Sequence, residues 1–175
     1  MNTSAASLNE KGIQAFQKKN YNQACEYFQK AADAYQNEDK PLDAAEALNN
    51  LSVALVKDKR AEEAVKVVQG TEILFEEAGD LKRKGMALGN QAAALEALGK
   101  NAEAIELYEE AVKIFHELDE DDLKTASLQA ISEIKLRKGQ LSGTALDAID
   151  ALVSNPNPTL RQKILKFIFR RFAKL

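Results

Sequence analysis

The chain is poor in the residues that cross-link, bend or ligate metals. It has one cysteine, one histidine, three prolines, eight glycines and no tryptophan among 175 residues. A single cysteine excludes an intrachain disulfide, and neither paired cysteines nor histidine-rich spacing is available for a metal site. With 45% hydrophobic and 29% charged residues, what remains is the composition of a soluble, helix-rich protein.

Long apolar runs are absent as well. No stretch approaches the roughly 20 apolar residues that span a bilayer. Residues 1–12, MNTSAASLNEKG, have neither the basic start nor the apolar core of a secretory signal. We therefore expect a cytoplasmic protein, in which Cys25 is a small buried residue in a reducing compartment.

Candidates for catalysis are few. His116 is far in sequence from Cys25, and we expect it to face water on a surface helix rather than to activate a thiol. The acidic run 117–122 lacks the central glycine and spaced ligands of a calcium loop, so we expect it to begin a helix. Gly85 and Gly89 are expected to mark close helix packing. The sequence predicts a protein that is not an enzyme and needs no metal or cofactor.

What the chain does contain is a segment pattern repeated at a step of 40 residues. A small residue recurs as an anchor in a helical stretch, and a second small residue follows each anchor after seven positions. The anchors are Ala24, Ala64, Ala104 and Thr144, and the followers are Ala31, Thr71, Ala111 and Ala151. A fixed period of this length indicates a solenoid, in which each unit buries its apolar face against its neighbours.

Each unit divides into two helical stretches. In the second unit, Pro41 suits the first position of a helix, and the polar run 57–60 ends that helix. A second helix follows the run, and its Val68, Leu74 and Phe75 are expected to face inward. Short turns between helices of similar length require antiparallel hairpins. We predict an array over residues 5–154, with units of about 5–40, 41–80, 81–120 and 121–154.

The pattern resembles the tetratricopeptide repeat (TPR) family, in a long form, because the usual TPR period is about 34 residues. Leu8 and Gly12 precede Tyr21, Ala24, Phe28 and Ala31, and the second and third units repeat the pattern; the fourth is degenerate, with Ala148 at an aromatic position. The resemblance implies an all-α, right-handed superhelical solenoid of four hairpins. It also implies a non-catalytic adaptor, scaffold or assembly factor that binds other proteins.

By the same resemblance, the first helix of each unit lines a concave groove that binds a peptide or helix. Asn50 and Asn90 occupy equivalent positions in successive units. A carboxamide can bind a peptide backbone because it donates and accepts hydrogen bonds at the same time. The alternative is that both cap local turns or face water. Asn50 matches one position of the TPR clamp for chaperone C-termini, but its basic residues are missing. The predicted groove residues are Asn9, Ile13, Phe16, Gln17, Asn49, Asn50, Val53, Val56, Lys57, Met86, Asn90, Ala93, Glu96, Gln129, Glu133, Leu136 and Arg137.

Residues 159–175 are predicted to form a basic amphipathic helix after the proline pair 156 and 158. They contain six of the 24 basic residues and none of the 27 acidic ones. Three interpretations stay open: a cap on the array, an interfacial helix at anionic lipid, or a segment that docks in a groove. A membrane-surface role is thus the alternative function; no nucleic acid is expected, and the protein should be a monomer or weak dimer. The polar face of this helix carries Lys163, Lys166, Arg170 and Lys174.

Overall fold

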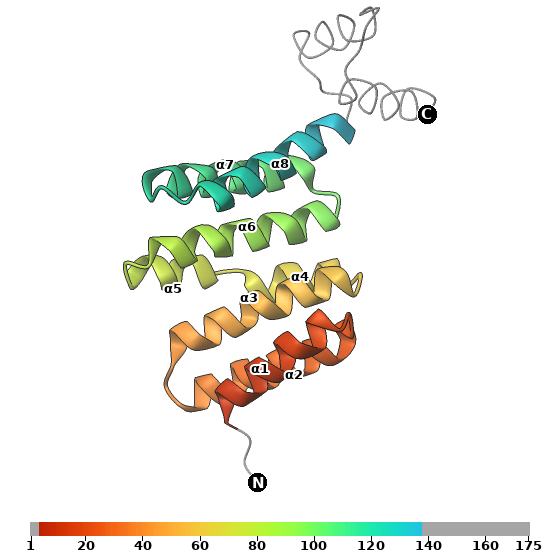
Figure 1. Cartoon of the computed structure of the whole chain (residues 1–175), viewed down its shortest axis with the longest axis vertical. Coiled ribbons are helices and arrows are strands. Elements are labelled where there is room, and N and C mark those ends of the chain that lie inside the picture. The colour runs from red at the N-terminus through yellow and green to blue at the C-terminus, as the bar shows by residue number, and fades with distance from the viewer. Residues whose placement is uncertain (1–3, 138–175) are drawn as a thin grey trace, which may run out of the picture. The chain divides into compact units, whose positions relative to one another are not determined.

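The computed structural model describes residues 4–137, and the regular structure in that range is entirely α-helical. Figure 1 shows the helices in chain order. They are α1 (Ala5–Gln17), α2 (Tyr21–Asn37), α3 (Pro41–Lys57), α4 (Ala61–Val68), α5 (Thr71–Glu77), α6 (Leu81–Ala97), α7 (Asn101–Glu117) and α8 (Asp121–Arg137). The predicted second helix of the fourth unit and the predicted helix over residues 159–175 lie outside the described residues.

One kind of three-residue turn connects successive hairpin helices. The central residue of each turn is left-handed, with φ between 54° and 83°, and these residues recur every 20 positions: Lys19, Asp39, Lys59, Gly79, Gly99 and Asp119. The backbone N–H after each of them reaches a carbonyl in the last helical turn, as Arg60 does to Leu55 at 2.8 Å. This is the Schellman end of a helix. It reverses the chain and produces the predicted hairpins.

The hairpins stack on one another in chain order, as Figure 1 shows for the described helices. Within hairpins, α1 packs on α2, α3 on α4, and α6 on α7. Between hairpins, α2 packs on α3, while α6 packs on α3, α4 and α5. The prediction of an all-α helical solenoid is confirmed.

The small residues that mark the repeat lie where helices touch. Ala24, Ala64 and Ala104 are each 0% exposed, and the followers Ala31, Thr71 and Ala111 are 0–3% exposed. A larger side chain would not fit at these points, because helix axes approach closely only over small residues. The contact positions are therefore the ones that the 40-residue step indicates.

The two glycines predicted to mark close packing behave differently. A Cβ on Gly85 would lie 2.7 Å from a ring carbon of Phe115, so close approach does require glycine there. A Cβ on Gly89 would meet nothing within 4 Å. The packing prediction is thus confirmed for Gly85 and wrong for Gly89, which faces open space.

The second helix of the second unit is not continuous, contrary to the sequence prediction. Helix α4 ends at Val68, and α5 begins at Thr71. Between them, Gln69 has φ −60° and ψ 126°, and Gly70 has φ 85° and ψ −5°, which are the angles of a type II turn. The turn changes the phase of α5: Phe75 stays buried at 1% exposure, but Leu74, predicted to face inward, is 37% exposed.

Candidate peptide-binding face

The first helices of the units, α1, α3, α6 and α8, form the face on which the sequence predicts binding. Between α1 and α3 this face has a hollow of about 240 Å³, lined by Ile13, Phe16, Gln17, Phe28, Asn50 and Val53. Five of these six residues are on the predicted list. The lining contains no ionisable side chain, so the hollow offers apolar surface beside a few carboxamide groups.

The floor of this hollow is an enclosed aromatic ring. Phe28 comes up from α2 and is 2% exposed, and its ring packs against the glycine at position 12 of α1. Phe16 meets the edge of the Tyr21 ring, with ring centroids 5.3 Å apart. Ile13, at 41% exposure, stands at the rim. Burying such an apolar rim against a partner is favourable, by about 25 cal/mol for each Å² removed from water.

A second hollow, of about 250 Å³, lies between α2, α3 and α4 and has a different character. Its lining includes Glu26, Arg60, Glu63 and the thiol of Cys25. Arg60 is already paired with Glu63 through two hydrogen bonds of 2.7 Å. Burial, first, and then the charge of Asp58 raise the pKa of Cys25 to about 11. This hollow is therefore lined by an arginine already paired with Glu63 and by a thiol that stays protonated at neutral pH.

The remaining predicted face residues lie on α3, α6 and α8. Met86 is 44% exposed, and Lys57, Glu133 and Arg137 are exposed as well. Val56 and Ala93 are half-buried, each packed against a core cluster. The side chains of Val56 and Ala93 thus supply partial apolar surface beside three exposed charged residues.

The asparagines form two hydrogen-bonded pairs across neighbouring units. The Nδ2 of Asn50 on α3 donates to the Oδ1 of Asn9 on α1 at 3.5 Å. The Nδ2 of Asn90 on α6 donates to the Oδ1 of Asn49 on α3 at 3.1 Å. Asn9, Asn50 and Asn90 are all half-buried. The two residues of each pair are 41 positions apart in the sequence, one more than the repeat step of 40.

Asn49 corrects the prediction of a groove wall at that position. Its side chain lies in the interior at 6% exposure. The Nδ2 of Asn49 donates to the carbonyl of Ala45 and to the Oγ1 of Thr71, both at 2.9 Å. A buried carboxamide must be hydrogen-bonded, and these internal partners account for its position. Asn49 therefore cannot contact a partner directly.

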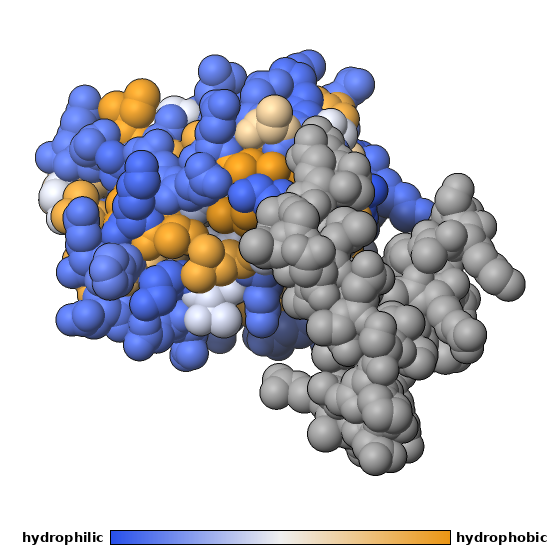
Figure 2. Space-filling model, turned by 90° about the horizontal axis from the view of Figure 1, so that it is seen from above, coloured by the Kyte–Doolittle hydropathy of each residue, from blue (hydrophilic) through white to orange (hydrophobic). Residues whose placement is uncertain are grey.

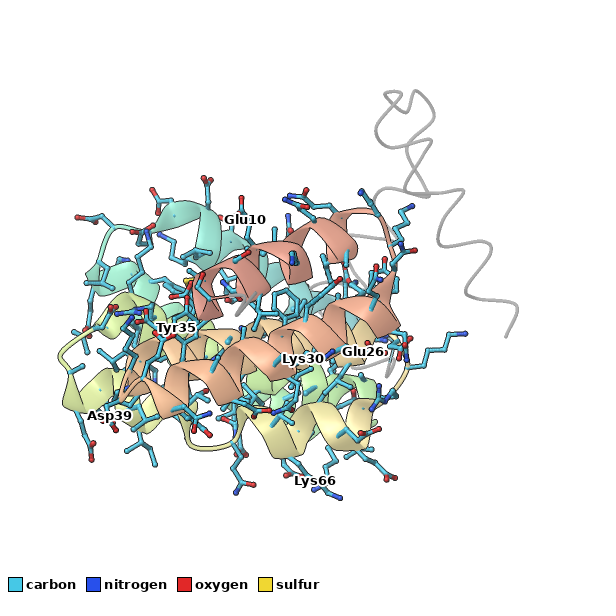
Figure 3. All side chains as sticks on the ribbon, turned by 90° about the horizontal axis from the view of Figure 1, so that it is seen from below. Glu10, Glu26, Lys30, Tyr35, Asp39 and Lys66 are labelled. Atoms are coloured by element: carbon cyan, nitrogen blue, oxygen red, sulfur yellow. The ribbon has the colours of Figure 1, made fainter. Side chains whose placement is uncertain are left out.

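Charged side chains dominate the outer surface around this face. Figure 2 views the molecule from the end that carries α7 and α8, and shows a mostly hydrophilic surface with several apolar areas. Glu10, Glu26 and Lys66 project outward from α1, α2 and α4 in Figure 3. Arg83 links Asp80 with Glu46 of the preceding unit, and its hydrogen bonds hold the pKa of Asp80 below the usual value. Large apolar side chains such as Ile73 are exposed elsewhere too, and the hollow between α1 and α3 differs from such surface in being concave.

Residues 4–137 contain no group of histidine, cysteine, aspartate or glutamate side chains that could hold a metal ion. None of the helices in that range combines the length and apolar character that crossing a bilayer requires. His116 is exposed at the end of α7, and Asp121 and Asp122 begin α8, as predicted. The acidic run is thus part of a helix start.

Known proteins resemble the chain in both sequence and fold. A family model described as "Soluble NSF attachment protein, SNAP" matches residues 2–167. The crystal structure of a TPR-like protein from Chlorobium tepidum matches with a TM-score of 0.62 and 18% identity, over 75% of this chain and 94% of that one. At this identity the likeness shows the fold alone. No curated protein sequence matches the chain.

Proposed function

The chain belongs to the soluble NSF attachment protein family, and on that premise we propose that it is a non-catalytic adaptor that binds a protein partner on the face of α1, α3, α6 and α8. The family's name describes attachment to another protein, and helical repeat arrays of this kind serve as binding surfaces. The proposal concerns a peptide or helix as the bound element.

The hollow between α1 and α3 carries the proposal. It combines an exposed isoleucine, two half-buried apolar side chains and the carboxamide of Asn50 around the buried ring of Phe28. Its volume of about 240 Å³ can admit one large apolar side chain. Interfaces commonly concentrate their energy in such an anchor, with carboxamides beside it to hold the backbone.

The test uses a random peptide library displayed on phage, followed by affinity measurements with the selected peptides. Ile13→Glu places a charge in the hollow, and we expect it to weaken binding by about 10- to 100-fold, which corresponds to roughly 1.5–3 kcal/mol. Ile73→Glu is the matched control, because Ile73 is also exposed, at 51%, but lies on α5 away from this face. Equal losses in the two variants would refute a site in the hollow.

The alternative function rests on the basic charge of residues 159–175, with Lys163, Lys166, Arg170 and Lys174 on the polar side of the predicted helix. Polybasic amphipathic segments bind anionic lipid surfaces. Co-sedimentation with phosphatidylserine vesicles tests it. If charge reversal at Lys166 and Arg170 abolishes sedimentation, and Ile13→Glu leaves peptide selection unchanged, the membrane-surface role replaces the groove.

A further inference from the structure

The orientation of the Asn49 carboxamide is fixed by its surroundings. One of its two polar atoms lies 2.9 Å from the backbone carbonyl of Ala45. A carbonyl can only accept a hydrogen bond, so the atom that faces it must be the nitrogen. The oxygen of Asn49 consequently points the other way, toward Asn90 on α6. Because Asn49 is 6% exposed, water does not offer an alternative partner.

Thr71 fixes the other end of this arrangement. Its hydroxyl lies 2.8 Å from the carbonyl of Val68, and that carbonyl has lost its helical partner because α4 ends there, at the type II turn through Gly70. The single hydroxyl proton must go to Val68. The Oγ1 of Thr71 can then only accept from the Nδ2 of Asn49, at 2.9 Å.

The orientation of Asn90 follows from these two constraints. The Oδ1 of Asn49 needs a donor, so the nitrogen of Asn90 must face it, at 3.1 Å. The reverse orientation would bring two carbonyl oxygens together. The Oδ1 of Asn90 is therefore directed away from Asn49, and no residue in the described part of the chain donates to it. Asn90 itself is half-buried on the candidate binding face.

We propose that the chain of hydrogen bonds from Asn90 through Asn49 and Thr71 to the Val68 carbonyl makes Asn90 a fixed acceptor, which takes a backbone N–H of the bound peptide. Asn49 and Thr71 are positioning residues that act through Asn90. The inference rests on the proposed function. The helix break contributes to this arrangement, because the freed Val68 carbonyl fixes the Thr71 hydroxyl as an acceptor, which together with the Ala45 carbonyl holds the Asn49 carboxamide.

Asn50 provides the internal contrast. Its Nδ2 reaches the Oδ1 of Asn9 at 3.5 Å, at the limit of a hydrogen bond, and both side chains are half-buried with no interior chain behind them. The Asn50 carboxamide can therefore turn over and offer either group to a ligand. Asn50 can thus adapt to the partner, whereas Asn90 requires a hydrogen-bond donor from it.

The first experiment needs no ligand. In ¹⁵N-labelled protein, the carboxamide protons of Asn49 and one proton of Asn90 should exchange with solvent more slowly than those of Asn50, by about ten-fold or more. Thr71→Ser retains the hydroxyl and should preserve this protection, whereas Thr71→Val should remove it from the Asn49 proton that points to position 71 and leave the proton bonded to Ala45 protected. If Asn49 and Asn90 exchange as fast as Asn50 in the wild type, or if Thr71→Ser loses the protection, the fixed orientation is wrong.

The second experiment uses a peptide selected from the phage library. Each of its backbone N–H groups is replaced in turn by N-methyl. One replacement should weaken binding to the wild type by about ten-fold but leave the affinity for Asn90→Ala unchanged, because the two changes remove the same hydrogen bond. Thr71→Val should reduce the penalty of that N-methyl group, and Thr71→Ser should restore it.

The outcomes separate this inference from the function on which it rests. If the peptide binds in the hollow but no N-methyl penalty depends on Asn90, the acceptor role is overturned and the adaptor function stands. If the library yields no binder, the proposed function is overturned, together with the ligand assigned to Asn90. If Thr71→Val folds normally and keeps the full N-methyl penalty that depends on Asn90, only the positioning role of Thr71 is overturned.

Discussion

Two helical glycines offer an opposed pair of substitutions to alanine. At position 12 on α1, the new Cβ would lie 2.6 Å from two carbons of the Phe28 ring, which is 2% exposed and enclosed. At position 89 on α6, it would meet nothing within 4 Å. Both sites are inside helices, so the helix-forming preference is common to the two variants and only the surroundings differ.

The magnitudes follow from this difference. Alanine is favoured over glycine inside a helix by about 1 kcal/mol. Gly89→Ala should therefore increase the free energy of unfolding by up to that amount. Gly12→Ala has the same benefit, but the Phe28 ring must be displaced, and overpacking of this kind costs roughly 1–3 kcal/mol. The net effect at position 12 should be a loss of as much as about 2 kcal/mol.

Thermal unfolding followed by far-ultraviolet circular dichroism can measure both the expected gain and the expected loss of stability. In a chain of this size, 1 kcal/mol shifts Tm by about 2–4 °C, so Gly89→Ala should melt higher and Gly12→Ala lower than the wild type. Gly85→Ala, whose Cβ would meet Phe115 at 2.7 Å, should follow Gly12→Ala. A rise in Tm for all three variants would refute the claim that aromatic rings are locked against these helices.

The turns and the thiol give two further predictions. Residues 99 and 59 both have left-handed backbone angles, in which a Cβ atom is unfavourable. Gly99→Ala adds a Cβ and should lower the free energy of unfolding by about 1 kcal/mol, whereas Lys59→Gly removes one and should raise it by somewhat less. Urea midpoints that move in the same direction in the two variants would contradict this. Cys25, with its pKa raised to about 11 from 9.0 by burial, should resist thiol reagents at pH 8. Since its neutral form is favoured, it stabilises the fold below pH 9 and loses that contribution as the pH rises toward 11. Between pH 9 and pH 11, the urea midpoint of Cys25→Ala should therefore fall less than that of the wild type. An equal fall in both proteins would refute the raised pKa of this thiol.

The regular part of the fold could be predicted because its determinants are local. Pro41 at the start of α3, the polar run before α4 and the glycine of the turn after α6 each act within a few residues, and the structure places helix ends at all three. Small residues at a fixed step gave the contacts between helices, since only they allow close approach. The hydrophobic spacing alone would not have distinguished these contacts from ordinary core positions.

The break in the second unit is not predicted by either of its two sequence signals alone. Gly70 stands inside an apolar spacing that a continuous helix also satisfies. Thr71 occupies a buried position where the neighbouring units have Ala31 and Ala111, and by size alone it fits the same pattern of small residues. A hydroxyl in place of a methyl at a buried contact implies a polar group that needs it, here the carbonyl freed at Val68. Glycine and hydroxyl together indicate the turn.

The carboxamides show the same limit for the candidate site. A step of 40 residues aligns equivalent positions, but side chains of neighbouring units meet at 41, as Asn9 with Asn50 and Asn49 with Asn90. The next positions in this series are Gly89 and residue 130, an alanine, so the series of amide pairs ends at the third unit. The open space beside Gly89 is then where the preceding units have a carboxamide. What looked like a packing glycine is the point at which the polar row stops, and it leaves Asn90 as the last carboxamide that the interior can orient.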